Sequence, residues 1–388
     1  MTTTAPSWRV LRAPEPPADL DDPDAWAVLA YSEIEHDREL AVWGWTDQWA
    51  PPWVLLGALR HQVHHRKVLF AAVRADEPAA GPAGEPAVPE RGFDPGDVAG
   101  VVLAVVPRDT AEGIAWVSPR VREGEHADEV RDLVLDAAER FVAGLGRDTV
   151  AFTTPHSPEP DAGPTTIEPP TGVGRVPGDA PPVRAALARG YALEQVTRHS
   201  TLHLPVPAVV LDALEAEARR SAGAYRTSTW FDEVPEGHLD GMAELWGRMS
   251  TDAPSAGLDQ QEEHWDAGRV RDHLSDLADR SQHVLITVAE DVGTGALVAF
   301  SVLQVPRAEV PFGFQEDTLV VREHRGHRLG TLVKVANLRA LAAWRPGVVR
   351  IHTWNAEENA HMLAINVALG FRADGVAAVW QKRLTTAG

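Results

Sequence analysis

The residues best suited to bind a ligand lie in one turn of the C-terminal half of the chain. Residues 317–321 are typical of a strand, and the turn that follows contains Arg325-Gly326-His327-Arg328-Leu329-Gly330. We expect a helix from about Thr331, and the first amides of a helix have no partner within it and lie at the positive end of its dipole. Such a turn suits a pyrophosphate group, although a basic turn that only caps the helix would have the same composition.

The turn differs from two common phosphate-binding patterns. It lacks the G-x-x-x-x-G-K-[ST] spacing of a P-loop and the G-x-G-x-x-G spacing of a dinucleotide site. The spacing alone therefore leaves the ligand open.

A second motif follows the turn, after a strand expected at 348–353. Residues 355–371 combine an asparagine-led start, a helix expected over Ala360–Leu369 and the ending Leu369-Gly370-Phe371. The Arg325–Gly330 loop resembles the Arg/Gln-x-x-Gly-x-Gly/Ala signature of the GNAT acetyltransferase superfamily, and the second segment resembles its closing element. The resemblance covers residues 234–384, with the two motifs in the superfamily's order.

This resemblance implies a mixed α/β fold that binds acetyl-coenzyme A. It implies that the amides from His327 to Thr331 hold the pyrophosphate, and that the segment Leu319-Val320-Val321 pairs through its main chain with the pantetheine arm. Asn355 and Asn359 are then expected to contact the cofactor or to brace the final helix. The loop departs from the signature at Arg328, which stands where the superfamily has its middle glycine.

Two adjacent carboxylates precede the loop and are candidate catalytic groups. By the resemblance, Glu316 and Asp317 lie at the start of the strand that lines the thioester. Acetyl transfer to an amine needs a general base, and a carboxylate beside another carboxylate can have a raised pKa that suits this role. The alternative is an acidic pair that only caps the neighbouring turn.

The proton donor for the leaving thiolate is not apparent from the sequence. Many superfamily members have a tyrosine seven residues after the asparagine that opens the last helix, and here that position is Asn366. An amide can donate a hydrogen bond to sulfur but cannot deliver a proton. Either Asn366 acts in this way, with water as the proton source, or another residue is the acid. His324 and His361 lie nearby but fit solvated surface histidines.

The acceptor is expected to bind between the first two helices of the C-terminal half. Their connection, Met249–Leu258, is polar, and it is followed by Asp259, Glu262, Glu263 and Trp265. This loop could accept an amine cation, or it could be a solvated loop with Trp265 in the core.

The order of expected strands and helices in the first half recurs in the second, which predicts an internal repeat. Gly190 and Gly370 are 180 residues apart, whereas Val117 and Val321 are 204 apart. The difference matches a Pro/Gly-rich stretch at 154–182, which, like 75–97, we expect to be an unstructured surface loop. We predict two tandem GNAT-like α/β domains, 1–205 and 206–388, joined near residues 205–207. Two unrelated α/β domains are the alternative.

The first half has no equivalent of the phosphate turn. After a strand expected at 113–117, the turn 118–128 has one glycine, and Glu123, Glu125 and Asp128 would repel a pyrophosphate. We therefore predict a degenerate copy that does not bind coenzyme A and that completes the active cleft or the interface between the halves.

Two clusters in the first half, one of tryptophans and one of histidines, could suggest other functions. Core or interface packing is a better explanation than an acceptor wall for the tryptophans at four nearby positions, Trp43, Trp45, Trp49 and Trp53. His61, His64 and His65 would share one face of a helix, but no carboxylate pattern accompanies them, so we predict no metal site.

Composition excludes several classes of function. The net charge of −20 argues against a nucleic-acid-binding face, and no apolar run approaches the ~20 residues of a membrane span. Cysteine is absent, which excludes disulfides, thiolate zinc sites and a cysteine nucleophile. The first residues do not resemble a secretory signal, so we expect a cytoplasmic protein.

The sequence thus favours an acetyl-coenzyme A-dependent N-acetyltransferase, monomeric or homodimeric, that acts on a primary amine of a small molecule or peptide. One alternative is a non-catalytic acyl-coenzyme A-binding or sensor protein, which the missing tyrosine suggests. Another is a mycothiol-synthase-like acetyltransferase, which shares the tandem layout.

Overall fold

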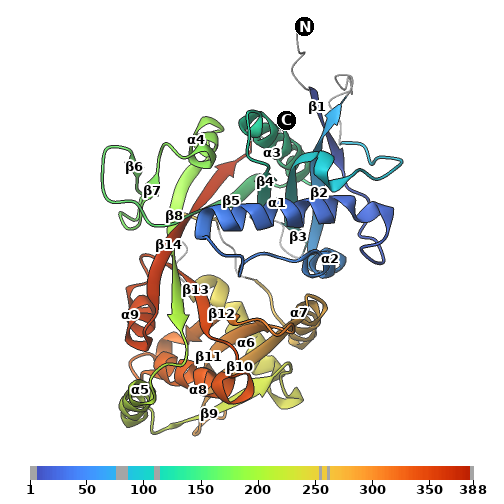
Figure 1. Ribbon diagram of the computed structural model, residues 1–388. Coiled ribbons are helices and arrows are strands. Elements are labelled where there is room, and N and C mark those ends of the chain that lie inside the picture. Colours follow the sequence, from blue (N-terminus) through green and yellow to red (C-terminus); the bar gives the residue numbers. More distant parts are fainter. Residues whose placement is uncertain (1–6, 76–85, 109–113, 253–255, 260–262, 385–388) are drawn as a thin grey trace. The chain divides into compact units, whose positions relative to one another are not determined.

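The computed structural model describes residues 7–75, 86–108, 114–252, 256–259 and 263–384 (Figure 1). The chain divides into two units, each with its own core. Unit 1 comprises Met1–Pro170, Arg175–Glu194 and Ala378–Gly388, and unit 2 comprises Thr171–Gly174 and Gln195–Ala377.

The predicted repeat is confirmed by the order of the elements. The first copy consists of β1 (Ser7–Arg12), α1 (Trp26–Trp43), α2 (Pro52–Arg60), β2 (His65–Ala75), β3 (Val98–Pro107), β4 (Ala115–Val121), α3 (Ala127–Gly144), β5 (Thr149–His156), α4 (Pro181–Ala188) and β8 (Ala192–His203). The second copy has the same order in β9 (Tyr225–Phe231), α6 (Leu239–Asp252), α7 (Ala267–Asp279), β10 (Gln282–Asp291), β11 (Leu297–Pro306), β12 (Phe312–Val320), α8 (Leu329–Trp344), β13 (Arg350–Ala356), α9 (Ala360–Leu369) and β14 (Arg372–Arg383). The helix α5 (Ala208–Ser221) connects the copies.

The last strand of each copy joins the strands of the other copy. β8 ends the first copy but pairs antiparallel with β13, from His203↔Arg350 to Thr197↔Ala356. β14 ends the second copy but neighbours β5 in the sheet order. The division between the units therefore differs from the expected boundary at 205/206. It falls within β8, after Glu194, and the chain returns to unit 1 at Ala378.

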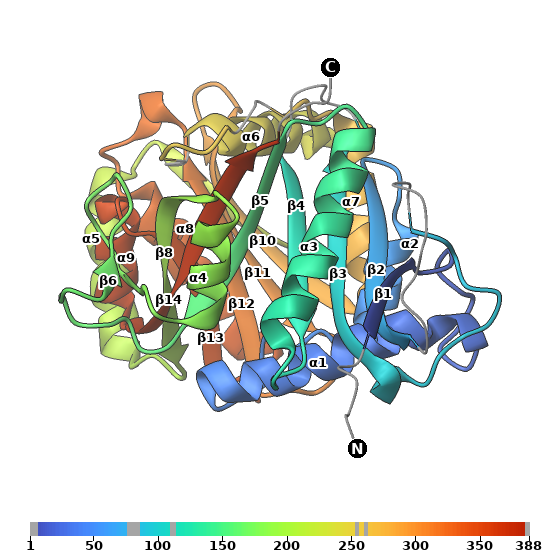
Figure 2. The same cartoon turned by 90° about the horizontal axis from the view of Figure 1, so that it is seen from above.

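The strands of unit 2 bury both faces, with the period of two that alternating side chains require. Val284, Ile286 and Val288 of β10 pack in one cluster with α6 and α7. Leu285, between them, packs in another with residues of α5 and α8. The two layers of helices are thus held by opposite faces of the same strands. In unit 1, α3 lies along β2, β3 and β4 (Figure 2).

The ends of α9 show how local sequence sets the helix boundaries. The side chain of Asn359 accepts a hydrogen bond from the amide of Met362 at 3.2 Å, which satisfies one of the unpaired donors of the first turn. Gly370 ends the helix with a left-handed φ of 103°, which glycine adopts without steric cost. The predicted helix Ala360–Leu369 is confirmed.

Two expectations about the first half need correction. The stretch 154–182 is not a structureless loop, because β5 extends to His156 and a short hairpin pairs β6 (Thr166–Ile167) with β7 (Val176–Pro177). The histidines do not share a helical face: α2 ends at Arg60, and His65 opens β2. No cluster of three or more potential metal-binding side chains occurs among the described residues.

The tryptophan-rich segment belongs to α1 and the loop after it. Trp43 is buried and stacks on Trp45 with 5.5 Å between ring centroids, and Trp49 donates to the main-chain oxygen of Ser32 at 2.8 Å. Trp53 is half exposed. Packing therefore accounts for most of this cluster. In the described ranges, none of the helices has the length and apolar character that crossing a bilayer requires.

Candidate active site

The site is built on two parallel strands that separate. β12 and β13 pair at only three positions, from Phe312↔Arg350 to Phe314↔His352. Beyond them, β12 continues along β11 and β13 continues along β8. The facing edges of β12 and β13 therefore have main-chain groups that no strand pairs, and an extended ligand can bind such edges as an added strand does.

A cavity of about 140 Å³ lies where the two strands separate. Its walls come from five elements of unit 2. The lining residues are Met249 of α6, Gln315, Glu316, Asp317 and Thr318 of β12, Lys334 of α8, Trp354 and Asn355 of β13, and Asn359 and Met362 at α9. The cavity thus brings together the predicted carboxylates and two predicted asparagines, which are 38 to 43 residues apart in the sequence.

A β-bulge directs both carboxylates into this cavity. β12 has three steps between Thr318 and Gln315 where β11 has two between Ser301 and Leu303, so one extra residue lies at 316–317. A bulge interrupts the alternation of side chains along a strand and is common beside active sites. This explains why the consecutive residues Glu316 and Asp317 line the same cavity.

Both carboxyl groups bind protons more tightly than carboxyl groups in water. Burial and the neighbouring Asp317 raise the pKa of Glu316 to about 7. Burial also raises the pKa of Asp317 to about 6, although a hydrogen bond from the indole of Trp246 opposes this shift. The side chain of Glu316 is accessible to water and is also surrounded by protein atoms. A position on the wall of a cavity explains both observations.

Lys334 of α8, which was not predicted from the sequence, lines the same cavity. The side chain is 1% exposed, and burial lowers the pKa of its ammonium group to about 7. Its Nζ lies 5.9 Å from the centre of the Phe371 ring. A signal was present in the sequence: Lys334 falls on the helical stripe of Gly330, Asn337 and Leu341, all of which are buried.

The phosphate turn has the form expected of an anion site. Residues 322–324 form a short 3-10 helix, Gly326 has a φ of 86°, and α8 begins at Leu329 without a side-chain cap. The first intrahelical bond is donated by the amide of Leu332, and within the described residues the amides of 329–331 have no main-chain acceptor. Three of the predicted amide donors, those of 329–331, are therefore available to a ligand, and their role in binding a pyrophosphate stays a prediction.

The arginine in place of the middle glycine occupies a strained position. Arg328 has a left-handed φ of 56°, and its guanidinium pairs at 2.6 Å with Glu217 of α5 on the surface. Gly330 lies inside α8 and packs closely on α9, since a Cβ there would lie 3.1 Å from the side chain of Ile365. The loop thus has the left-handed backbone that glycine favours at Gly326 and at Arg328.

Arg328→Gly is expected to stabilise the protein by about 1 kcal/mol, since a left-handed conformation costs a non-glycine residue roughly that much. The lost surface ion pair has little effect. Urea unfolding would measure the change. Arg325→Gly is the matched control: Arg325 has an ordinary φ of −68°, so glycine there should destabilise. Equal losses in both variants would contradict the strain at Arg328.

The predicted pantetheine-binding segment is oriented differently from expectation at Val321. Its amide donates to Val298 at 2.9 Å and its carbonyl accepts from His324 at 2.9 Å, so both groups are engaged. Because orientation alternates along a strand, Leu319 shares this orientation and faces β11. Among residues of this segment, Val320 therefore has the main chain directed toward the opening between β12 and β13, where its carbonyl accepts from the Arg325 side chain at 3.1 Å.

Asn366 does not occupy the position expected of a catalytic group. It is 2% exposed, and its amide nitrogen donates to Asn355 Oδ1 at 2.6 Å. It braces β13 against α9 and is not among the residues that line the cavity. Asn359 lines the cavity and also caps α9.

The expected acceptor loop lies partly outside the described residues, since 253–255 and 260–262, including Glu262, are not described. Glu263 accepts hydrogen bonds from Trp265 at 3.2 Å and from Arg269 at 2.6 Å. Trp265 packs against Trp246 in the core, with 5.1 Å between ring centroids. Trp265 is therefore mainly a packing residue, and Met249 is the part of this region that reaches the cavity.

The first copy has a comparable opening between β4 and β5, which pair only at Ala115↔Val150 and Trp116↔Ala151. Here an ion-pair cluster lies where the second copy has Glu316 and Asp317. Arg120 of β4 binds Glu35 of α1 through Nε at 3.1 Å and Nη2 at 2.9 Å, and Arg38 bridges Glu35 and Glu39. Both carboxyl groups of this cluster are buried and paired with arginine.

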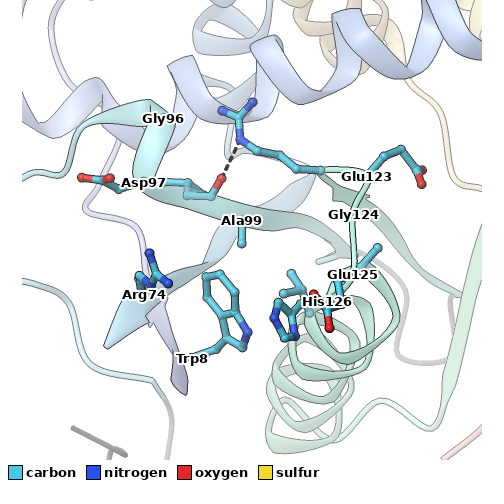
Figure 3. Close-up of a pocket in the computed structure, with 13 residues that line it drawn as sticks. Trp8, Arg74, Gly96, Asp97, Ala99, Glu123, Gly124, Glu125 and His126 are labelled. Carbon is cyan, nitrogen blue, oxygen red and sulfur yellow. Dashed lines mark hydrogen bonds between the residues drawn. The ribbon is translucent and has the colours of Figure 1, made fainter. Parts of the chain in front are cut away.

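A larger cavity of about 270 Å³ lies near the start of α3 in unit 1 (Figure 3). Its charged lining residues are three acids, Asp97, Glu123 and Glu125, and two arginines, Arg74 and Arg122, the second of which is bound to Val98 and Glu33. The helix α3 also has two acidic residues in its first turn, where α8 has none. The edge of His126 meets Trp8 with 6.0 Å between ring centroids. Size alone would favour this cavity, but its charge does not suit a pyrophosphate, so we place the candidate active site in unit 2.

Solved structures of the same fold cover almost the whole chain. A tandem GNAT protein from the clavulanic acid biosynthesis pathway, without acetyl-coenzyme A, has a TM-score of 0.68 and 19% identity over 98% of this chain and all of its own. A GCN5-related N-acetyltransferase from Sphaerobacter thermophilus has a TM-score of 0.56 and 12% identity, with 97% and 95% covered.

A GCN5-related glucosamine N-acetyltransferase region of a fungal multi-domain β-N-acetylglucosaminidase also matches, with a TM-score of 0.59 and 13% identity. The match covers 98% of this chain and 38% of that one. No protein-family model and no curated protein sequence matches. The chain therefore has the tandem GNAT acetyltransferase fold, as its motifs predicted.

Proposed function

We propose that this protein is an N-acetyltransferase that transfers the acetyl group of acetyl-coenzyme A to a primary amine, with unit 2 as the active unit. The observation that carries the proposal is the cavity between β12 and β13, which contains two carboxyl groups of raised pKa. One end of the same opening leads toward the loop 322–330, whose helix amides suit a pyrophosphate.

The residues present fit coenzyme A. The free edges of the separated strands offer hydrogen bonds to the amides of a pantetheine arm, and Arg325, His327 and Arg328 are exposed around the phosphate turn. When bound, the acyl donor supplies a thioester for attack by the amine. The chain's own contribution is to orient that thioester and to manage protons.

Glu316 is the proposed general base. An amine arrives at neutral pH mainly as an ammonium ion and must lose a proton before it can attack. A carboxylate with a pKa near 7 is both ionised enough and basic enough to accept that proton, directly or through water. Asp317, which is held by Trp246 of α6, supports this group by keeping its pKa high.

Cofactor binding is the first test. Coenzyme A at 100 times its dissociation constant is expected to stabilise the protein by about 2.7 kcal/mol, because it binds only the folded state. Thermal unfolding with and without coenzyme A measures this effect. Gly330→Leu, which places a bulky side chain against α9, is expected to abolish the shift. An equal shift in this variant would show that the ligand binds elsewhere.

The acceptor is tested by release of thiol from acetyl-coenzyme A across a panel of amines. The panel contains amino acids, polyamines, a short peptide with a free N-terminus, glucosamine because of the structural neighbour, and a cysteinyl aminosugar with its thiol blocked. The chain contains no cysteine, so the protein adds no background to a thiol reagent. Binding of coenzyme A without turnover on any amine would favour the sensor function instead.

A further inference from the structure

The proposed reaction needs a group that donates a proton to the leaving thiolate, and none has been assigned above. Acyl transfer ends with a thiolate that must gain a proton, and the position at which many GNAT enzymes have a tyrosine is Asn366 here. Its amide is bound to Asn355, and it does not line the cavity. The acid therefore has to be another group that reaches the space between β12 and β13.

We propose that Lys334 is the proton donor to the leaving thiolate, a proposal that rests on the function proposed above. Lys334 is the one cation among the described residues that line this cavity. It comes from α8, the helix that begins at the end of the phosphate turn, whereas the proposed base Glu316 comes from β12. Base and acid thus belong to different walls of one cavity.

Lys334 forms no ion pair with any residue that the structure describes, although Glu316 and Asp317 line the same cavity. Burial lowers the pKa of its ammonium group. The Nζ atom lies over the Phe371 ring, a weak partner for an ammonium group. A buried ammonium that is not directly paired is costly, so its retention favours a function that needs either the charge or the proton.

The choice of lysine is itself informative in this chain. Of its 36 basic residues, 33 are arginine and three are lysine. The other two lysines have structural partners: Lys67 donates to the main-chain oxygen of Ala58 at 2.7 Å, and Lys382 pairs with Glu139 at 2.8 Å. Arginine cannot release its proton at neutral pH, whereas a buried lysine can.

The proton balance of the step is closed by these groups. Glu316 first takes one proton from the ammonium ion and passes it to water. The neutral amine nitrogen then bonds to the carbonyl carbon, the carbon–sulfur bond breaks, and its electron pair stays on sulfur. The second proton leaves the nitrogen through Glu316, the Nζ proton of Lys334 moves to sulfur, and the neutral lysine regains a proton from water. The products are an amide, coenzyme A with a free thiol, and one proton released to water.

The first experiment titrates the lysine directly. With only three lysines, a sample labelled with ¹³C at lysine Cε gives three signals, and the one absent from Lys334→Met belongs to Lys334. We expect this signal to titrate near pH 7, well below the ordinary lysine value of 10.5. A Lys334 signal that titrates above pH 10 would overturn the proposal without any assay of activity.

The second experiment measures turnover with acetyl-coenzyme A and the best amine of the panel. Lys334→Met is expected to lower kcat about 100-fold or more while coenzyme A affinity changes less than about threefold. Lys334→Arg should remain low at neutral pH, since it keeps the charge but not the transferable proton. Lys382→Met is the matched control and should keep full activity.

The pH profile separates proton donation from packing. The charged groups that face Lys334 across the cavity are Glu316 and Asp317, while β13 and α9 contribute the uncharged Asn355, Asn359 and Met362. In the wild type, kcat should fall above about pH 7 as Lys334 loses its proton, and Lys334→Met should lack this fall.

Two outcomes would refute the proposal while leaving the proposed function intact. Full activity of Lys334→Met would do so. A loss confined to malonyl- or succinyl-coenzyme A, with acetyl-coenzyme A unaffected, would show that the ammonium binds an acyl carboxylate instead. Absence of thiol release by the wild type on every amine would instead count against the proposed function.

Discussion

Glu316→Gln is expected to lower kcat for acetyl transfer by about 10²- to 10⁴-fold, the usual contribution of a general base. Glutamine has nearly the shape of glutamate but cannot take a proton from the acceptor. The substitution should leave coenzyme A affinity unchanged, because the carboxyl group lies in the cavity and away from the phosphate turn. Rates of thiol release and calorimetric binding of coenzyme A check the two parts.

The pH dependence of activity identifies which carboxyl group is the general base. Wild-type activity should rise with pH up to about pH 7 as Glu316 ionises, ahead of the fall expected from Lys334 at higher pH. The rise should be absent from Glu316→Gln. Asp317→Asn is the matched control: it removes a neighbouring charge and should shift the rise to lower pH with a smaller loss of rate. If Asp317→Asn is instead the more damaging change, then Asp317 is the base.

Glu316→Gln should lower activity but raise the stability of the folded protein above neutral pH. Burial and Asp317 raise the pKa of Glu316 in the folded protein to about 7, from an ordinary value of 4.5. A raised folded pKa means that the carboxyl group stabilises the fold fully below the ordinary pKa, and that this contribution is lost as the pH rises toward 7. Glu316→Gln should therefore unfold at higher urea concentration than the wild type at pH 8, and at a similar concentration at pH 4.

Arg120→Met is expected to destabilise unit 1 by about 3 to 5 kcal/mol, the typical cost of leaving a buried charge without its partner. Burial opposes ionisation of Glu35, but the charges of Arg120 and Arg38 hold its pKa below the ordinary value. Without Arg120, one guanidinium remains for two buried carboxyl groups, and Glu39 Oε2 already has no hydrogen-bond partner in the part of the chain that the structure describes. Urea unfolding, followed by tryptophan fluorescence, measures the loss.

Two comparisons make this result specific. Arg383→Met removes an exposed pair with Asp148 in the same unit and should cost less than about 1 kcal/mol. The loss in Arg120→Met should shrink as the pH falls and Glu35 becomes neutral, since a depressed pKa stabilises only above the ordinary value. A loss below 1 kcal/mol at pH 7 would show that the cluster contributes little to stability.

Most strands and helices of the second copy could be predicted from the sequence because its motifs are local. A strand, a turn and a helix start are set by neighbouring residues, and Asn359 and Gly370 mark the ends of α9 by capping chemistry. The helices α1, α2 and α5 and the strands β1 and β9 were not predicted. In α1, buried residues cover most of the circumference and include Glu35 and Glu39, so no narrow apolar stripe stands out against a polar face.

The features that define the site depend on non-local pairing. The extra residue at 316–317 is visible only against β11, and the opening exists because β12 and β13 take different partners. Asn366 could be placed at the family's tyrosine position, but its bond to Asn355 required the fold. Lys334 was not predicted because it stands alone among apolar residues of a helix, where a single lysine is usually solvated.

The strand exchange between the copies has a consequence for how the protein is made. Residues 378–383 complete unit 1 with Trp380, which is fully buried and donates to Thr154 at 2.9 Å. The ribosome adds these residues only after residues 195–377 of unit 2, so unit 1 cannot be completed until unit 2 has been synthesised. Domains that fold one after another during synthesis need no such wait. Here, a nascent first copy would expose the edge of β5 until β14 is made.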